Sequence, residues 1–543
     1  MSSLKHSLGS VSTLYSVKIL PLLLISFFSP SVLAEIEFDG VIGTSLITAN
    51  TNSDGTRRTN GNTNSFLLNP SLTLSYSGPV AEFFWNIDHT YLYQDIDKND
   101  TSEDRSFTEY QISGQVDIIK NYLQVNAGSQ LRYQNSDPSL VFADDFVSGA
   151  QNLGKFRTSF GSLLFTSASQ RWFDVNWEIR ASKIESDQSF SSSANLNNND
   201  LGTYFELSQG REFKQIRWTV TNTFQDTDGR VNGNDLKSRE SSVDFGLGIY
   251  GPLGLYLVAQ DERNQFDGAL NLGLRDYTSY GAGLEWSQSR NRRISLALNR
   301  SEETSTGDKD EFLSLDMVWA FSARTRLEAK FGRRAYGDSG RFSFVYNTKK
   351  LRVAATYDEN VTNFSRLVSN FEELGVFVCP VGATEQNQCF LPSSLAYQLQ
   401  PDEQFNSLFQ NTPEISEEVI ERRLGQISAG FEAKKLTLSL TVAGGRTQFL
   451  QTNRTQDNVT STLSMNYNAG VKTSLYSTIN YNKTDFLDTN TRNQILRAES
   501  GIRHQLTPEL SISSQLTYTD SDTRSSVTNY QERRVSVSMS YQL

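Results

Sequence analysis

Few side chains in this sequence have the types and spacing needed for catalysis. A hydrolase would need a nucleophile, a histidine base and a carboxylate that orients the histidine. The chain holds only three histidines, and His89 and His504 lie in alternating segments, on the face shared with apolar neighbours. Acidic pairs such as Asp144 and Asp145 fall in polar connecting segments, where carboxylates are usually only solvated. Since no P-loop, dinucleotide fingerprint or metal-ligand spacing occurs, we expect no enzyme activity, no cofactor and no metal site.

The two cysteines, Cys379 and Cys389, are separated by nine residues. In an exported protein such a pair most simply forms one disulfide that closes a small loop. Closing so short a loop typically contributes about 2–3 kcal/mol, so its effect would be local.

Residues 1–34 have the pattern of a cleaved signal peptide. Lys5 and Lys18 precede an apolar run at 19–28, and small residues follow up to Ala34. The run has ten residues, whereas a membrane-spanning helix needs about 20. Cleavage after Ala34 would leave a chain of net charge −13. An acidic chain of this kind is a poor partner for nucleic acid.

After residue 35 the sequence alternates between apolar and polar residues with period two. Clear examples are the segments 81–91, 173–180, 243–249 and 253–260. Each is about ten residues long, the length that a tilted β-strand needs to cross a bilayer.

The connections between these segments fall into two alternating classes. Eleven are short, at 77–79, 119–121, 169–171, 213–215, 251–254, 291–293, 323–326, 347–350, 433–435, 469–472 and 506–509. Twelve are longer and polar, near 51–64, 95–104, 134–152, 187–200, 225–237, 261–274, 302–309, 335–340, 359–421, 450–456, 484–492 and 520–530. Short periplasmic turns and long external loops are typical of outer-membrane barrels. The connections therefore predict 24 strands with both termini in the periplasm.

The final segment supports the same fold. Val535, Val537, Met539 and Tyr541 alternate with serines, as in a strand that is apolar outside and polar inside. The segment also resembles the terminal signal of barrels delivered to the barrel assembly machinery. A soluble all-β repeat protein is the alternative explanation of the alternation. We predict an all-β fold: a single large transmembrane antiparallel β-barrel over residues 35–543, in the Gram-negative cell outer membrane, with lipid and lipopolysaccharide as partners.

The inward face of the predicted barrel carries charges of both signs, which a hydrated lumen keeps ionised at small cost. Basic residues concentrate in one sector, and these are Arg326, Lys330, Arg334, Arg341 and Arg352. Either this sector favours anions, or its members pair with neighbours such as Glu328. The glycines of GLGIYG and GAGLEW share the inward face, where we expect them to relieve crowding in the wall.

The stretch 331–362 resembles the PEP-CTERM-system-associated outer membrane protein family. The matching elements are Phe331, Gly332, Arg334 and Gly337, then Phe342, Phe344 and Tyr346, then Lys349 and Lys350, then Tyr357, Glu359, Val361 and Thr362. The resemblance implies a place beside exosortase-dependent protein sorting and exopolysaccharide production. It implies no catalytic residues.

These observations predict an outer-membrane channel or scaffold that works with exopolysaccharide or surface-protein export, with polysaccharide or export components as partners. A general or substrate-specific uptake porin and a structural or adhesive surface protein without flux are the alternatives. The segment 359–421 is much longer than the other connections and carries apolar stretches, so we expect it to form a plug or an external lid.

Overall fold

The computed structural model describes residues 35–53, 61–96, 101–135, 146–147, 153–167, 171–187, 197–229, 235–267, 273–289, 291–303, 307, 309–334, 337–363, 376–380, 403–407, 419–450, 452–523 and 529–543. The predicted signal peptide, residues 1–34, lies outside this part of the chain. Within it, no helix has both the length and the apolar character that a membrane-crossing helix requires.

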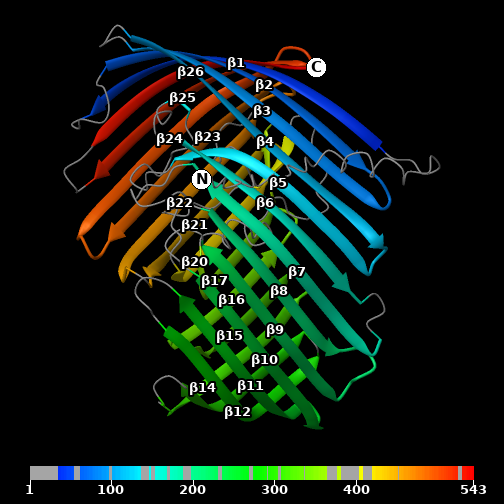
Figure 1. The fold of residues 1–543 in the computed structure, drawn as a ribbon. Coiled ribbons are helices and arrows are strands. Elements are labelled where there is room, and N and C mark those ends of the chain that lie inside the picture. Colours follow the sequence, from blue (N-terminus) through cyan, green and yellow to red (C-terminus); the bar gives the residue numbers. More distant parts are fainter. Residues whose placement is uncertain are drawn as a thin grey trace, which may run out of the picture.

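Twenty-four antiparallel strands form one closed sheet, in which each strand pairs with the next and β1 pairs with both β2 and β26 (Figure 1). The first twelve are β1 (Glu35–Ser53), β2 (Gly61–Ser77), β3 (Ala81–Ile96), β4 (Thr101–Ile119), β5 (Leu123–Asn135), β6 (Leu153–Thr166), β7 (Phe173–Ser186), β8 (Asn197–Gln209), β9 (Ile216–Gly229), β10 (Asp235–Tyr250), β11 (Leu253–Asp267) and β12 (Gly273–Ser289). The others are β13 (Arg292–Glu303), β14 (Lys309–Ser322), β15 (Thr325–Arg334), β16 (Gly337–Asn347), β17 (Leu351–Asn363), β20 (Val419–Glu432), β21 (Leu436–Phe449), β22 (Arg454–Asn468), β23 (Thr473–Phe486), β24 (Thr491–Gln505), β25 (Leu510–Thr523) and β26 (Tyr530–Gln542). The predicted fold class and strand number are confirmed.

All eleven predicted short connections join consecutive strands at one end of the barrel, which we call the turn end. Asn121 (φ 65°) and Gly251 (φ 56°) take the left-handed conformation that such tight turns favour. The start of β1 and the end of β26 lie at the same end, since Glu35 pairs with Ser77 and Tyr541 pairs with Leu510. The opposite end, which carries the longer connections, is called the loop end.

Several predicted long connections were too wide. The predicted connection 335–340 includes the start of β16, which begins at Gly337. Likewise β17 continues to Asn363 and β20 begins at Val419, inside the predicted insertion 359–421. Strand ends that project beyond an apolar belt meet water on both faces, so they lose the alternation while keeping their ladder hydrogen bonds.

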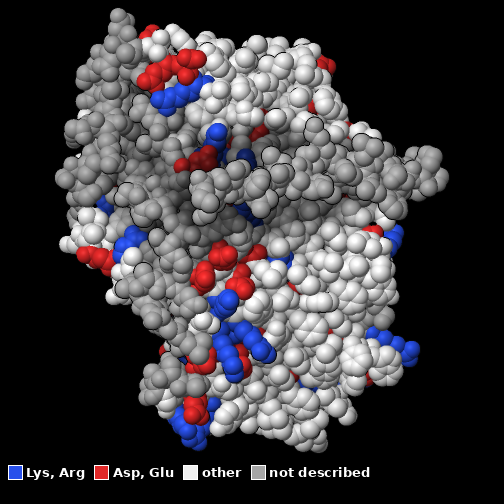
Figure 2. All heavy atoms as spheres, viewed as in Figure 1, with Lys and Arg blue, Asp and Glu red and all other residues white. Residues whose placement is uncertain are grey.

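The outer face of the barrel is apolar, as the alternation predicts. Exposed outward side chains include Leu284, Leu298, Leu313, Ile427, Leu516 and Val537. Rings gather near the turn end, where Trp286 and Trp319 stack with centroids 5.3 Å apart. Figure 2 shows that the outer surface over β7–β9 has few charged side chains, and that Lys, Arg, Asp and Glu lie along its margins.

Two short strands are not part of the ring. β18 (Val376–Pro380) and β19 (Glu403–Ser407) form a separate antiparallel sheet in which Cys379 is opposite Gln404. Cys389 lies outside the described residues, so the disulfide stays a prediction. The same holds for the plug or lid expected in the segment 359–421, most of which lies outside the described residues.

Candidate functional site in the lumen

The inner face of the barrel carries three chemically different surfaces. The inner face of β9–β17 carries ionised side chains and is called the charged sector. The inner face of β20–β26 carries mainly amides and hydroxyls and is called the neutral sector. The inner face of β1–β4 carries an apolar patch near the loop end.

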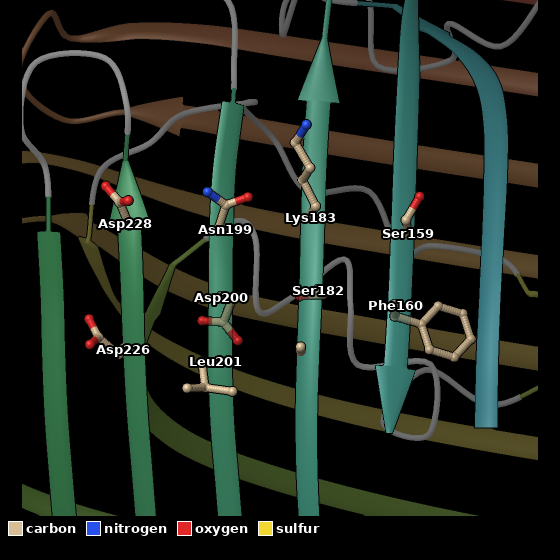
Figure 3. Close-up of a pocket in the computed structure, with 10 residues that line it drawn as sticks. Ser159, Phe160, Ser182, Lys183, Asn199, Asp200, Leu201, Asp226 and Asp228 are labelled. Atoms are coloured by element: carbon tan, nitrogen blue, oxygen red, sulfur yellow. The ribbon is translucent and has the colours of Figure 1, made fainter. Parts of the chain in front are cut away.

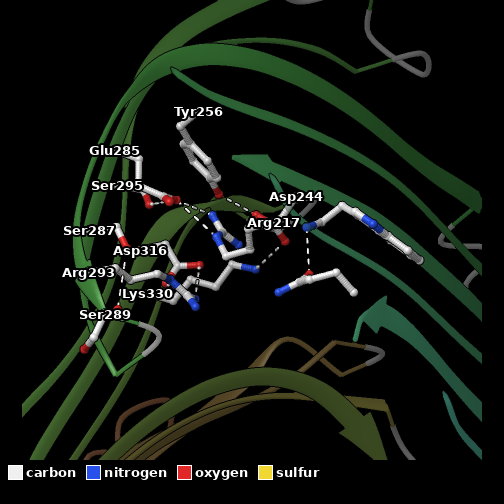
Figure 4. A network of polar contacts seen from close by, with 12 residues as sticks. Arg217, Asp244, Tyr256, Glu285, Ser287, Ser289, Arg293, Ser295, Asp316 and Lys330 are labelled. Carbon is white, nitrogen blue, oxygen red and sulfur yellow. Dashed lines mark hydrogen bonds and ion pairs between the residues drawn. The ribbon is translucent and has the colours of Figure 1, made fainter. Parts of the chain in front are cut away.

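A buried ion pair lies at the centre of the charged sector (Figure 4). Arg217 on β9 donates from Nε and Nη2 to Oε2 of Glu285 on β12, at 3.1 and 2.5 Å. Ser295 Oγ donates to the same carboxylate oxygen at 3.0 Å. The side chains of Arg217 and Glu285 are only 16% and 9% exposed, and the guanidinium lies 5.5 Å from the centroid of the Tyr256 ring. The two buried charges compensate each other because they are in direct contact and the carboxylate accepts a further hydrogen bond.

Glycines in the adjoining strands make room for this pair, as the sequence predicts. A Cβ atom on Gly246 would lie 3.0 Å from both carboxylate oxygens of Glu285. A Cβ on Gly283 would lie 1.8 Å from the carbonyl oxygen of Leu296, which belongs to the neighbouring strand. The wall at this point therefore packs too closely for any larger residue.

Replacing Gly283 should impair assembly. Gly283→Ala forces the backbone of β12 and β13 apart, and overpacking of this kind costs typically about 1–3 kcal/mol. We expect a smaller fraction of heat-modifiable, folded protein on gels after refolding into detergent. Gly430→Ala is the matched control, because a Cβ there meets nothing within 4 Å. Equal yields from the two variants would show that the wall at Gly283 is not tightly packed.

Other ion pairs join strands that are far apart in the ring. Lys330 Nζ on β15 lies 3.9 Å from Asp244 Oδ2 on β10. Arg334, also on β15, contacts Glu240 on β10 at 2.6 Å and Glu262 on β11 at 3.2 Å. Neighbouring strands are about 4.8 Å apart, so these pairs are separated by about 19–24 Å along the wall. The wall must therefore curl back on itself, and the contacts bridge the space inside the curl.

The structure places most of the predicted basic sector in ion pairs, and two of its members, Lys330 and Arg334, bridge distant strands. Arg326 pairs with Glu328 on its own strand. Arg341 Nε donates to Asp358 Oδ1 on the neighbouring strand at 2.8 Å. Lys330 and Arg334 make the bridging contacts described above, and Arg352 is an exposed member of the same inner face. Because four of the five basic residues contact carboxylates, the sector has no uniform positive surface.

The neutral sector is a grid of cross-strand hydrogen bonds. Thr462 Oγ1 donates to Asn480 Oδ1 at 2.8 Å, and Asn482 Nδ2 donates to Thr460 Oγ1 at 3.1 Å. Charges on this face occur mainly as pairs within one strand, such as Arg497 with Glu499 and Arg534 with Glu532. The neutral sector therefore offers hydrogen-bond donors and acceptors without a strong net field.

A short apolar element contacts the inner wall near the loop end. Phe146 and Val147 pack with inward side chains of β1–β4, and the rings of Phe146 and Phe107 lie 4.7 Å apart. Gln94 Nε2 donates to the Val147 carbonyl at 2.9 Å. The remaining members of this cluster are Ile47, Leu67, Leu92, Tyr133 and Leu153. The sequence analysis missed this contact, and the only available signal was an apolar pair within the connection 134–152.

The two histidines outside the predicted signal peptide belong to the wall. His89 Nδ1 lies 2.8 Å from Thr108 Oγ1, and His504 Nδ1 lies 2.9 Å from Thr473 Oγ1. Each partner stands opposite its histidine in the ladder. In the part of the chain that the structure describes, no group of three or more His, Cys, Asp or Glu side chains could hold a metal ion.

A hollow of about 540 Å³ lies among the loop-end parts of β6–β9 (Figure 3). Two of its carboxylates have partners: Asp200 Oδ1 accepts from Gln225 at 2.9 Å, and Asp226 Oδ2 lies 3.9 Å from Lys237 Nζ. We assign this hollow no function.

No protein-family model matches the sequence, and no curated protein is similar to it in sequence. Among solved structures, OmpTdeltaL8, a loop L8 deletion mutant of an outer membrane protein of Vibrio cholerae, is 7% identical over 94% of this chain and 99% of that chain, with a TM-score of 0.29. The FrpB iron transporter from Neisseria meningitidis is 9% identical over 92% and 82%, with a TM-score of 0.41. A BenF-like porin from Pseudomonas fluorescens is 9% identical over 94% and 98%, with a TM-score of 0.30. We draw no conclusion about function from likenesses this distant.

Proposed function

We propose that this chain is an outer-membrane channel for hydrophilic solutes. The observation that carries the proposal is a closed 24-stranded ring with an apolar outer face and an inner face of paired charges, amides and hydroxyls. A closed ring leaves no unpaired strand edge in lipid, and a hydrated interior keeps ion pairs such as Arg341 with Asp358 solvated. The barrel would cross the membrane with its turn end, and both termini, in the periplasm.

Planar-bilayer recording of the purified full chain tests this function. We expect discrete conductance steps, because amides and hydroxyls such as those of Asn480 and Thr462 line the neutral sector of the lumen. The control is the same preparation after heat unfolding in detergent, which should give no steps. A folded, membrane-inserted protein without conductance would favour the alternative of a structural or adhesive surface protein.

The segment 331–362 suggests a biological context for the channel. In the structure it forms β16, most of β17 and the last residues of β15, with Phe342, Phe344 and Tyr346 on the outer face and Arg334 in the lumen. Its family resemblance supports the further proposal that the channel serves exopolysaccharide or surface-protein export. The neutral sector supports the same proposal, since a grid of amides and hydroxyls suits an uncharged sugar polymer.

Deleting the gene in its own host tests the export context. Secreted polysaccharide should fall while uptake of small sugars stays normal, and the intact gene should restore secretion. Normal polymer release together with slower solute uptake would favour the uptake porin.

A further inference from the structure

We propose that Arg334 and Lys330 set the size limit of the lumen, because their ion pairs hold the two walls of the charged sector together. This inference rests on the proposed channel function. The two side chains exclude hydrated solutes from one part of the lumen.

The partners of Arg334 and Lys330 lie on strands far from β15 in the ring. β15 is separated from β11 by three strands and from β10 by four. A lysine or arginine and a carboxylate cannot span that distance along a gently curved wall. Their contacts at 2.6 to 3.9 Å therefore exist only because β10 and β11 face β15 across the lumen.

Arg334 makes more contacts across this space than Lys330 does. Its guanidinium contacts two carboxylates at once, and Glu262 is only 2% exposed. Asn264 Nδ2 donates to the other oxygen of Glu262 at 2.8 Å, so the carboxylate is fixed in place. We call Arg334, Glu240 and Glu262 the Arg334 bridge. Lys330 adds a second, more exposed contact closer to the turn end, with its side chain 58% exposed.

Loss of the Arg334 bridge leaves two carboxylates without their cationic partner. If Arg334 loses its charge, Glu240 and the buried Glu262, which is 2% exposed, remain as two like charges, and water must enter to solvate Glu262. β15 and β16 are also the shortest strands of the ring, with ten and eleven residues.

The test compares two lumenal arginines of β15. Arg334→Gln removes the bridge, whereas Arg326→Gln removes an equal charge whose carboxylate partner, Glu328, is on the same strand. We expect Arg334→Gln to raise the single-channel conductance at least twofold and to admit larger sugars in liposome-swelling assays. Arg326→Gln should stay within a few tens of per cent of the wild type. Equal behaviour of the two variants would overturn the proposal.

A second variant covers the case in which Arg334→Gln fails to assemble. The triple variant Arg334→Gln, Glu240→Gln and Glu262→Gln removes the bridge without leaving an uncompensated charge, and it should also widen the pore. If this variant assembles and conducts like the wild type, the bridge does not set the size limit.

A distance measurement separates this proposal from the channel function. Spin labels at Val243 on β10 and Phe331 on β15, both exposed on the outer face, report the separation of the two walls. Their distance should lengthen and broaden in Arg334→Gln but not in Arg326→Gln. If the wild type does not conduct but the distance changes as expected, the channel function fails and the bridge stands. If it conducts and the distance is unchanged, the bridge fails.

Discussion

Leu463→Arg should sharply destabilise the barrel in lipid, while Thr462→Arg, one residue away, should have little effect. Leu463 is near the middle of β22 and is 43% exposed on the outer face. An arginine at the middle of the lipid-facing surface of a barrel costs about 2–4 kcal/mol. Thr462 faces the lumen, where its hydroxyl contacts Asn480 and a long charged side chain can reach water.

Urea-induced unfolding in lipid vesicles measures both variants. The midpoint should move to lower urea for Leu463→Arg and stay near the wild type for Thr462→Arg. Comparable losses at both positions would mean that the two faces of β22 do not differ in their surroundings, and the outward face would not be a lipid face.

Glu285→Ala should be the most damaging substitution in the lumen. It leaves the guanidinium of Arg217 in a largely buried site without its carboxylate, and removing one partner of a buried ion pair typically costs about 3–5 kcal/mol. The double variant Arg217→Ala and Glu285→Ala removes both charges and should be less damaging than the single one. The free energy of unfolding of all three proteins gives the coupling between the two residues.

An exposed pair on the wall is the control for this cycle. Arg446 and Asp457 are 2.7 Å apart on adjacent strands, with side chains 54% and 35% exposed, and surface pairs of this kind contribute about 0–1 kcal/mol. Asp457→Ala should therefore change the midpoint little. If Glu285→Ala is as mild as Asp457→Ala, the centre of the charged sector is open to water.

The strand number and the two faces of the wall could be predicted from the sequence because both depend on local patterns. Each crossing needs about ten alternating residues, and each tight turn has its own composition. Segments with less regular alternation are strands as well, for example β6 (Leu153–Thr166) and β8 (Asn197–Gln209). The inward position of Lys330 followed from the same parity.

The arrangement of the lumen could not be predicted in this way. Parity places Lys330 on the inner face but contains nothing about the curvature of the ring, so its contact with Asp244 is invisible in the sequence. The local pairing with Glu328 that the sequence suggested holds for Arg326 but not for Lys330 or Arg334. The contact of Phe146 with Phe107 was missed for a related reason, because a connection that returns to the inner wall has no periodic pattern.

The most direct measurement of the central claim, a membrane barrel with a polar lumen, is single-cysteine accessibility along β22 from Val459 to Met465. Fluorophores at 459, 461, 463 and 465 should be quenched by a lipid-soluble agent, and those at 460, 462 and 464 by a water-soluble agent, with a strict period of two. Quenching by the water-soluble agent at every position would contradict the account, because it would show that both faces of the strand meet water.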